Sequence, residues 1–182
     1  PAPDPAPVAM IAEQGVYHLS AGADGAAVLT TEVCLHVFDP AGCRHLPLLT
    51  AERAWEKITA DEKPVVPVAA KGWLCFTPPA AGAYVVRAAC PLRSLPTGGS
   101  PLRLAVPVTV RTHARFDVPG AWEATVEGEA EAVRGTAERG THGRIAVTPR
   151  ASLGLLLRPA AAAREHPPRY RLAGAVVWDL QP

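Results

Sequence analysis

The stretch that decides the fold, Glu32–Gly42, reads Glu-Val-Cys-Leu-His-Val-Phe-Asp-Pro-Ala-Gly. Apolar side chains stand at every second position from Val33 to Val37. Successive side chains of a strand point to opposite faces, so this period of two predicts a strand with one buried face. Asp39–Gly42 then supplies a turn, because proline presets the first corner and glycine accepts unusual dihedral angles. A short strand closed by a turn is the repeating unit of a β-sandwich.

The same unit recurs along the chain at close spacing. One segment differs: Ala51–Ile58 holds good helix formers behind a capping Thr50, and Pro64 forbids continuation of a helix. We therefore predict an all-β protein, an antiparallel β-sandwich of the jelly-roll or immunoglobulin-like type, with one short helix. The strands are expected at Val16–Leu19, Ala27–Thr31, Glu32–Phe38, Gly72–Thr77, Ala83–Ala89, Leu102–Arg111, Trp122–Glu127, Gly143–Thr148, Ser152–Arg158 and Arg169–Trp178.

The chain divides by composition into three parts. Residues 1–7 alternate proline with other residues and predict an extended tail. Residues 8–113 hold the sandwich motifs. Residues 114–182 form either a second small β unit or an extension of the same sandwich.

Charge and composition narrow the class of protein. The net charge is +1 and the charges are interspersed, which argues against nucleic-acid binding. No apolar run approaches the roughly 20 residues that span a bilayer. The proline-rich start without methionine and the four cysteines favour an exported bacterial protein, periplasmic or extracellular, with its signal peptide removed.

Two stretches resemble a known family. Leu35–Gly42 is similar to the strand and Asp-x-x-Gly turn of bacterial pre-peptidase C-terminal domains, and Phe76–Arg87 is similar to their later strand with Gly-x-Tyr. The resemblance covers about residues 14–110. It implies a β-sandwich that accompanies secreted enzymes and binds without catalysing. The aspartate pairs that many members use for calcium are missing, and the four cysteines depart from the pattern.

Four cysteines allow three disulfide pairings. The local one, Cys34–Cys43 with Cys75–Cys90, conflicts with a tight turn, because it leaves the first pair roughly 13 Å apart when bridged Cα atoms lie within ~7 Å. The resemblance places the strand before the Asp-Pro-Ala-Gly turn antiparallel to the strand after Pro78–Gly82. It thereby implies the nested bridges Cys34–Cys90 and Cys43–Cys75.

A repeated Cys-x-His gives an alternative site. In a hairpin that turns at Asp39–Gly42, Cys34, His36, Cys43 and His45 would share one face, and thiolate and imidazole bind zinc or copper. In an exported protein the cysteines are expected to be oxidised instead. The alternative function is therefore a periplasmic metal-binding protein that uses His36 and His45.

Catalytic signatures are weak. None of the four serines lies in a strained elbow, and no cofactor-binding motif is present. The carboxylates of Glu123, Glu127, Glu129 and Glu131 are expected to lie on a solvated strand face, and the tryptophans in the core. We predict no enzyme and no cofactor. The expected function is that of a non-catalytic exported accessory or structural subunit with a protein partner, or of a module for a small-molecule or carbohydrate ligand that the sequence does not identify.

Overall fold

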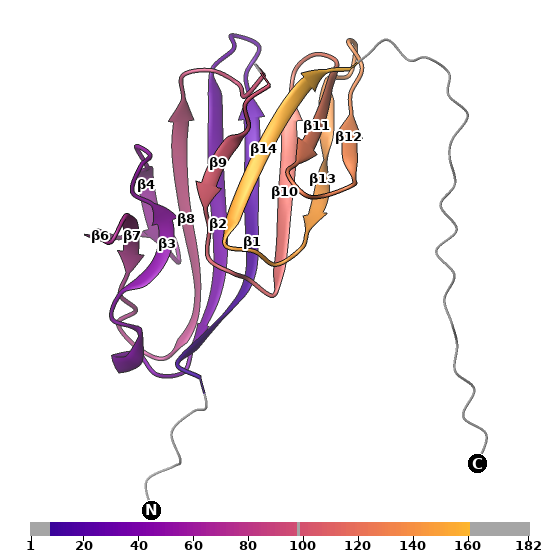
Figure 1. Ribbon diagram of the computed structural model, residues 1–182. Coiled ribbons are helices and arrows are strands. Elements are labelled where there is room, and N and C mark those ends of the chain that lie inside the picture. Colours follow the sequence, from indigo (N-terminus) through magenta and orange to yellow (C-terminus); the bar gives the residue numbers. More distant parts are fainter. Residues whose placement is uncertain (1–7, 98, 161–182) are drawn as a thin grey trace, which may run out of the picture.

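The computed structural model describes residues 8–97 and 99–160 and is nearly all β (Figure 1). Its strands form sheets of seven, four and three strands, arranged as a sandwich. The predicted all-β, antiparallel sandwich is confirmed, with one parallel pair, β1 with β10. Among the described residues, no helix has the length and apolar character needed to cross a bilayer.

The seven-stranded sheet forms one whole layer of the sandwich. Its inner face is mostly apolar because side chains alternate: in β2 every second residue from Ala27 to Val37 is buried, among them Leu29 and Val33, and the residues that alternate with them are partly exposed. In spatial order the strands are β13 (Thr141–Val147), β10 (Arg111–Val118), β1 (Met10–Ala21), β2 (Ala27–Val37), β8 (Gly82–Leu92), β4 (Glu56–Ala60) and β5 (Lys63–Pro64).

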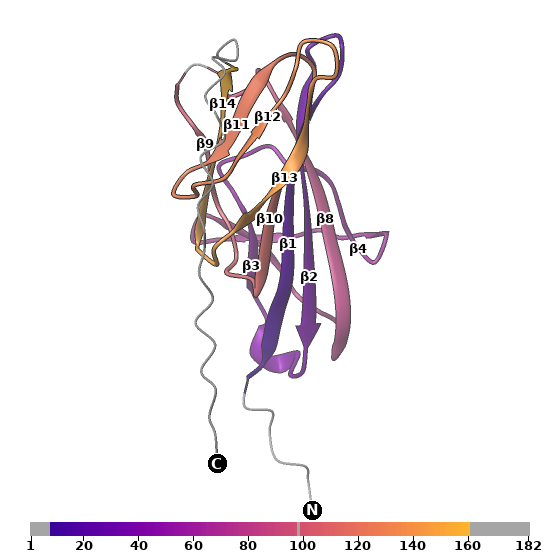
Figure 2. The ribbon, with the colours of Figure 1, turned by 90° about the vertical axis from the view of Figure 1, so that its right-hand side faces the viewer.

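Two smaller sheets cover the inner face of this layer side by side, as Figures 1 and 2 show. The four-stranded sheet has the order β12 (Ala132–Arg134), β11 (Trp122–Val126), β14 (Ser152–Pro159) and β9 (Leu102–Ala105). The three-stranded sheet has the order β3 (Leu46–Thr50), β7 (Trp73–Phe76) and β6 (Val68–Ala70). A single 3-10 turn, η1 (Ala41–Cys43), precedes β3.

Each small sheet forms its own apolar cluster with the large sheet. One cluster joins Leu19 and Phe116 of the large sheet to Leu155 of β14, and the other joins Leu35 to Leu48 of β3. Trp55 packs against both clusters, and its indole Nε1 donates to the carbonyl of Thr50 at 2.7 Å. Trp55 therefore connects the two halves of the core.

The predicted helix Ala51–Ile58 is wrong. Residues 51–53 form a turn and Glu56–Ala60 is strand β4, which pairs with β8 through a bulge between Glu56 and Thr59. A helix this short has little stability of its own, whereas a strand satisfies backbone groups at the edge of β8.

The predicted strands differ from the structure at their ends, and β3, β5, β6 and β12 were not predicted. Ala27–Thr31 and Glu32–Phe38 were expected as two strands but form the single strand β2. Leu102–Arg111 was expected as one strand, but β9 ends at Ala105, before Pro107, and β10 begins at Arg111. The tail 1–7 and the strand expected at Arg169–Trp178 lie outside the described residues.

The boundary expected at residue 113 falls inside β10. Strand β10 pairs with β1 in the seven-stranded sheet, and β14 pairs with β9 in the four-stranded sheet. Each of these two sheets therefore contains strands from both sides of the expected boundary. In the described part of the chain, residues 114–160 extend the same sandwich.

Candidate functional site

The outer face of the seven-stranded sheet carries a row of polar and charged side chains. No described strand covers this face, because both small sheets pack on the inner one (Figure 2). Strand β10 shows the division: Ala114, Phe116 and Val118 are buried, while Arg115 and Asp117 point outward. Strict alternation in Arg111–Val118 is what places these charges on one surface.

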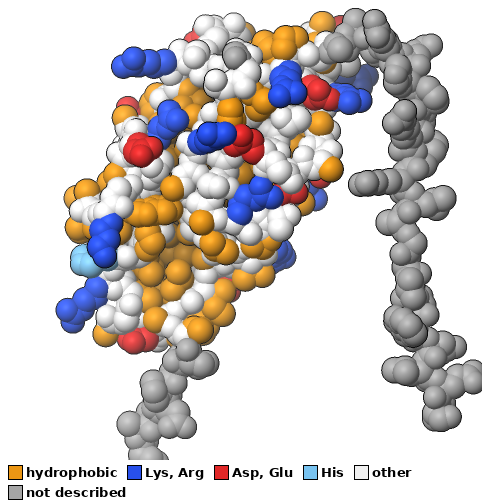
Figure 3. Space-filling model, viewed as in Figure 1, with side chains coloured by type: hydrophobic (Ala, Val, Ile, Leu, Met, Phe, Trp, Pro, Cys, Tyr) orange, Lys and Arg blue, Asp and Glu red, His pale blue; other side chains and the backbone are white. Residues whose placement is uncertain are grey.

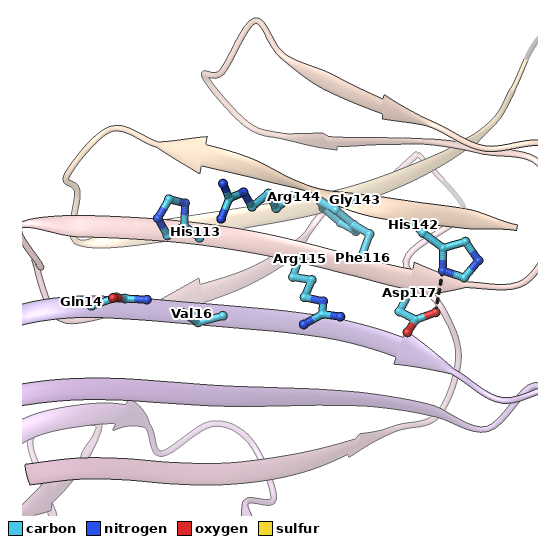
Figure 4. A pocket seen from close by; sticks show the side chains of 9 residues that line it. All are labelled: Gln14, Val16, His113, Arg115, Phe116, Asp117, His142, Gly143 and Arg144. Atoms are coloured by element: carbon cyan, nitrogen blue, oxygen red, sulfur yellow. Dashed lines mark ion pairs between the residues drawn. The ribbon is translucent and has the colours of Figure 1, made fainter.

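Two adjoining depressions mark this face. The first, of about 450 Å³, lies over β1, β10 and β13, and Figure 4 shows the side chains around it. The second, of about 660 Å³, lies over β1, β2, β4 and β8. They meet at Val16 and Arg115, which line both.

The carboxylates that line the depressions are already paired. Asp117 Oδ1 lies 2.8 Å from His142 Nδ1 (Figure 4), and the other ring nitrogen of His142 contacts the backbone carbonyl of Arg139. Glu32 Oε2 accepts from Nε of Arg87 at 2.8 Å. Glu32 is therefore balanced by Arg87, and Asp117 is the one carboxylate left near the remaining cations, held in place by its contact with His142.

Arg115, Arg144 and Lys57 are those cations, and Lys57 lines the second depression. Arg115 and Arg144 are direct cross-strand neighbours on β10 and β13, both are exposed, and none of the three cations forms an ion pair within residues 8–97 and 99–160. His18 is the neighbour of Arg115 on β1. Burial and the nearby charge of Arg115 lower the pKa of His18, against the opposing effect of Asp117, so this imidazole is neutral at pH 7.

Two histidine nitrogens on the same face lack partners. His18 Nε2 and His113 Nδ1 are buried and form no hydrogen bond in the described structure. Buried polar atoms without a partner are rare in folded proteins. Both belong to rings that border the depressions.

The predicted disulfides are not formed. All four cysteines are free thiols, and Cys34 pairs with Val85 while Cys90 pairs with Leu29. The expected antiparallel pairing of these two strands is present, but β2 begins at Ala27, so Cys34 lies far along the strand from Cys90 and on the opposite face.

The second predicted bridge, Cys43–Cys75, is also absent, because Cys43 does not lie on a strand that pairs with β7 at Cys75. Cys43 belongs to η1, before β3 begins at Leu46. Cys75 of β7 pairs instead with Pro47. The nested pairing Cys34–Cys90 and Cys43–Cys75 is therefore wrong for this structure.

The hairpin required by the metal hypothesis is also missing. His36 lies on β2 with its ring 4.6 Å from that of Phe38, whereas His45 precedes β3 in a different sheet. Nowhere in the described ranges do three or more side chains of the metal-binding types gather.

Three of the four carboxylates considered for catalysis are tied to arginines, and the fourth, Glu131, is exposed. Glu123 pairs with Arg134, and Glu127 accepts two hydrogen bonds from Arg103, which lower the pKa of that carboxyl. Glu129 pairs with Arg150. The hydroxyl of Ser20, beside Asp117 in the register, bonds to the carbonyl of Val28. These groups stabilise loops and strand ends.

The tryptophans occupy several environments. Trp55 and Trp122 pack against the core as expected, and Trp122 Nε1 donates to the carbonyl of Pro119. Trp73 is half-buried on β7. Trp178 lies outside the described residues.

Sequence reasoning missed Arg115 and Arg144. The signal was present in Arg111–Val118, where charged or polar residues alternate with residues that can be buried. This segment crosses the expected domain boundary at residue 113, and its partner strand β13 begins only at Thr141, far along the chain, so the two arginines were not recognised as neighbours.

Comparisons with known proteins add no function. No family model matches the chain, and no curated protein matches it. The fold is similar to a crystal structure of an M1 zinc metallopeptidase from Deinococcus radiodurans, with a TM-score of 0.38 and 14% identity over 81% of this chain and 42% of that one. A two-domain M1 zinc metallopeptidase mutant bound to L-tryptophan gives the same TM-score and coverage at 11% identity. The chain thus spans less than half the length of these structures, and similarity at this level supports no conclusion about activity.

Proposed function

We propose that this protein is a non-catalytic binding module that takes its ligand on the outer face of the seven-stranded sheet. The observation that supports the proposal is the meeting of the two depressions at Val16 and Arg115, beside arginines without counter-ions. Concave surfaces with a few converging polar groups are the usual ligand sites of proteins. The resemblance to pre-peptidase C-terminal domains and the export of the chain stay predictions, and the free thiols give export no support.

The test is a ligand titration followed residue by residue. Isotope-labelled protein is titrated with neutral sugars, acidic sugars, amino acids and inorganic oxoanions, and amide chemical shifts are recorded. We expect saturable shifts confined to β1, β10, β13 and β2 for one class of ligand. Conversion of a ligand to product, or saturable shifts confined to the small sheets, would contradict the proposal.

Blocking variants locate the binding surface. Val16→Trp places a bulky ring where the depressions meet, and it should abolish the shifts. Thr125→Trp is the matched control, because Thr125 is a half-buried residue of β11 between the buried Ala124 and Val126. The control variant should bind as the wild type does.

A second candidate function, an accessory subunit, is favoured by a group of exposed apolar side chains. Figure 3 shows apolar side chains on the lower half of the face that carries the small sheets. A second group lies on the outer side of the large sheet, where Ile11 pairs with His36 and the ring of Phe38 lies against that of His36. Near the start of β1 the exposed apolar residues include Ile11, Phe38 and Val110, where Phe38 N donates to Ala9 O and Val110 N donates to Ala12 O. A partner that co-purifies with the wild type and is lost from a Phe38→Asp, Val110→Asp variant would support this role.

A further inference from the structure

Arg115 and Arg144 are two like charges that lie side by side on the outer face, and no described side chain there forms an ion pair with either of them. The register places the two residues directly opposite each other, so their Cβ atoms lie about 5 Å apart. Like charges in this position destabilise a pair of strands. In Figure 4 the side chain of Arg115 leans toward β1 and that of Arg144 leans toward His113. An anion bound by both would draw the two guanidinium groups together and convert this repulsion into attraction.

No described side chain forms an ion pair with either arginine. Glu32 is engaged by Arg87 and Asp117 contacts His142, each at 2.8 Å, so Asp117 is the single carboxylate beside two arginines. The neighbour on the other side of Arg115 is His18, whose pKa is lowered by burial and by that same arginine. The row Arg144, Arg115, His18 thus presents two cations and one neutral imidazole to the first depression and its border with the second.

The geometry and charge of this row select the kind of anion. Each guanidinium is a planar fork that binds two oxygens in parallel. A carboxylate has two oxygens and one charge, so a single arginine satisfies it. A phosphate monoester has three free oxygens and a charge near −2, and inorganic phosphate and sulfate have four oxygens and a similar charge, which matches two arginines. A sulfate monoester carries one negative charge, but its three free oxygens exceed what a single guanidinium fork binds.

We propose that the depression over β1, β10 and β13 binds a phosphate or sulfate group between the guanidinium groups of Arg115 and Arg144. This inference rests on the proposed function, because it names the ligand class of the same face. The second depression continues from Val16 past the hydroxyl side chains of Thr30 and Thr59. Its lining also holds Lys57 and the Arg87–Glu32 ion pair, groups that donate or accept hydrogen bonds. It accommodates a hydroxyl-bearing body attached to the anionic group, as in a phosphorylated or sulfated sugar.

The test measures binding and stability together. Inorganic phosphate, inorganic sulfate, glucose 6-phosphate and a sulfated monosaccharide are titrated calorimetrically into the full chain, with acetate and chloride at matched ionic strength as comparisons. We expect the tetrahedral anions to bind and to raise Tm, since a ligand of the native state stabilises it. Stronger binding of one ester than of the free anions identifies phosphate or sulfate as the natural group.

Charge-neutralising variants decide whether the arginine pair is responsible. Arg115→Gln and Arg144→Gln should each weaken binding about tenfold or more. Each should also raise Tm in the absence of anion, because the like-charge repulsion is removed. Arg158→Gln removes one positive charge from β14 on the small sheet and should change neither quantity.

Three results would overturn the inference. They are no binding of phosphate or sulfate at millimolar concentration, equal binding by all three variants, and acetate binding as tight as that of the tetrahedral anions. Saturable shifts from a neutral sugar on the same face would then leave the proposed binding module intact. Hydrolysis of glucose 6-phosphate would instead overturn the proposed function.

Discussion

The hydroxyl of Tyr84 binds both backbone groups of Ala80, donating to its carbonyl at 2.8 Å and accepting from its amide at 3.2 Å. These bonds tie the beginning of β8 to the turn that precedes it, in the manner of the tyrosine corner found in many sandwiches. The Gly-x-Tyr that resembles a family motif thus has a structural role here. Tyr84→Phe should lower the free energy of unfolding by about 1 kcal/mol, measured by urea denaturation. An unchanged stability would show that the two bonds exchange freely with water.

Tyr17→Phe, in contrast to Tyr84→Phe, should increase the free energy of unfolding. Its side chain is 1% exposed and its hydroxyl has no hydrogen-bond partner in the described structure. Tyr17→Phe removes a buried, unsatisfied group and should raise the free energy of unfolding by about 1 kcal/mol. A loss of stability would instead indicate an ordered water on this hydroxyl.

The pH dependence of Tyr17 provides a separate check. Burial raises the pKa of this phenol far above its ordinary value. The native state therefore holds the proton while the unfolded chain releases it above about pH 10, so native stability is lost as pH rises through that range. The fall in Tm between neutral and strongly alkaline pH should be smaller for Tyr17→Phe than for the wild type. Parallel profiles would contradict the assignment.

Strand β2 shows what local pattern does and does not predict. Its alternation gave a correct strand with the correct inward face from Val33 to Val37. Ala27–Thr31 was expected as a separate strand, and its continuity with Glu32–Phe38 was missed, because the polar Thr31 occupies an inward position at 3% exposure and interrupts the apolar pattern. With a strand that starts at Glu32, Cys34 was expected near the strand start, opposite Cys90. Because β2 starts at Ala27, Leu29 pairs with Cys90 and Cys34 pairs with Val85, so the predicted disulfides are wrong.

The wrong helix prediction and the missed site have different physical causes. Residues 51–58 have helix-forming composition, but an unpaired edge of β8 outweighs that weak local preference. The site depends on β1 pairing in parallel with β10, and on β10 pairing with β13. Pairing between segments far apart in the sequence leaves no local signal, so Arg115 and Arg144 cannot be recognised as neighbours without the structure.

Thr141 anchors the strand that carries His142 and Arg144. It is fully buried, and its Oγ1 accepts from Trp122 N at 3.0 Å and donates to Gly120 O at 2.9 Å. Thr141→Val keeps the shape but removes both bonds, so we expect a loss of about 2 kcal/mol in the free energy of unfolding. Thr141→Ser keeps the hydroxyl and should lose clearly less. Equal losses from the two variants would show that the methyl group, and not the hydroxyl, stabilises this position.

The four thiols should remain reduced and should react in a defined order. Cys34 is partly exposed on the outer face, whereas Cys43, Cys75 and Cys90 are buried. Burial raises the pKa of all four thiols, with Glu32 and Glu13 adding to the effect at Cys34, so alkylation of the native protein should require higher pH than that of a free cysteine.

Alkylation followed by mass spectrometry checks this order. Native protein should be labelled first at Cys34, and protein unfolded in urea should take four labels without a reducing agent. Cys34→Ser should remove the first label and leave Tm within a few degrees of the wild type, because its side chain is not part of the core. Fewer than four labels on the freshly purified, unfolded chain would mean that a disulfide forms, and peptide mapping would then identify which cysteines move together to make it.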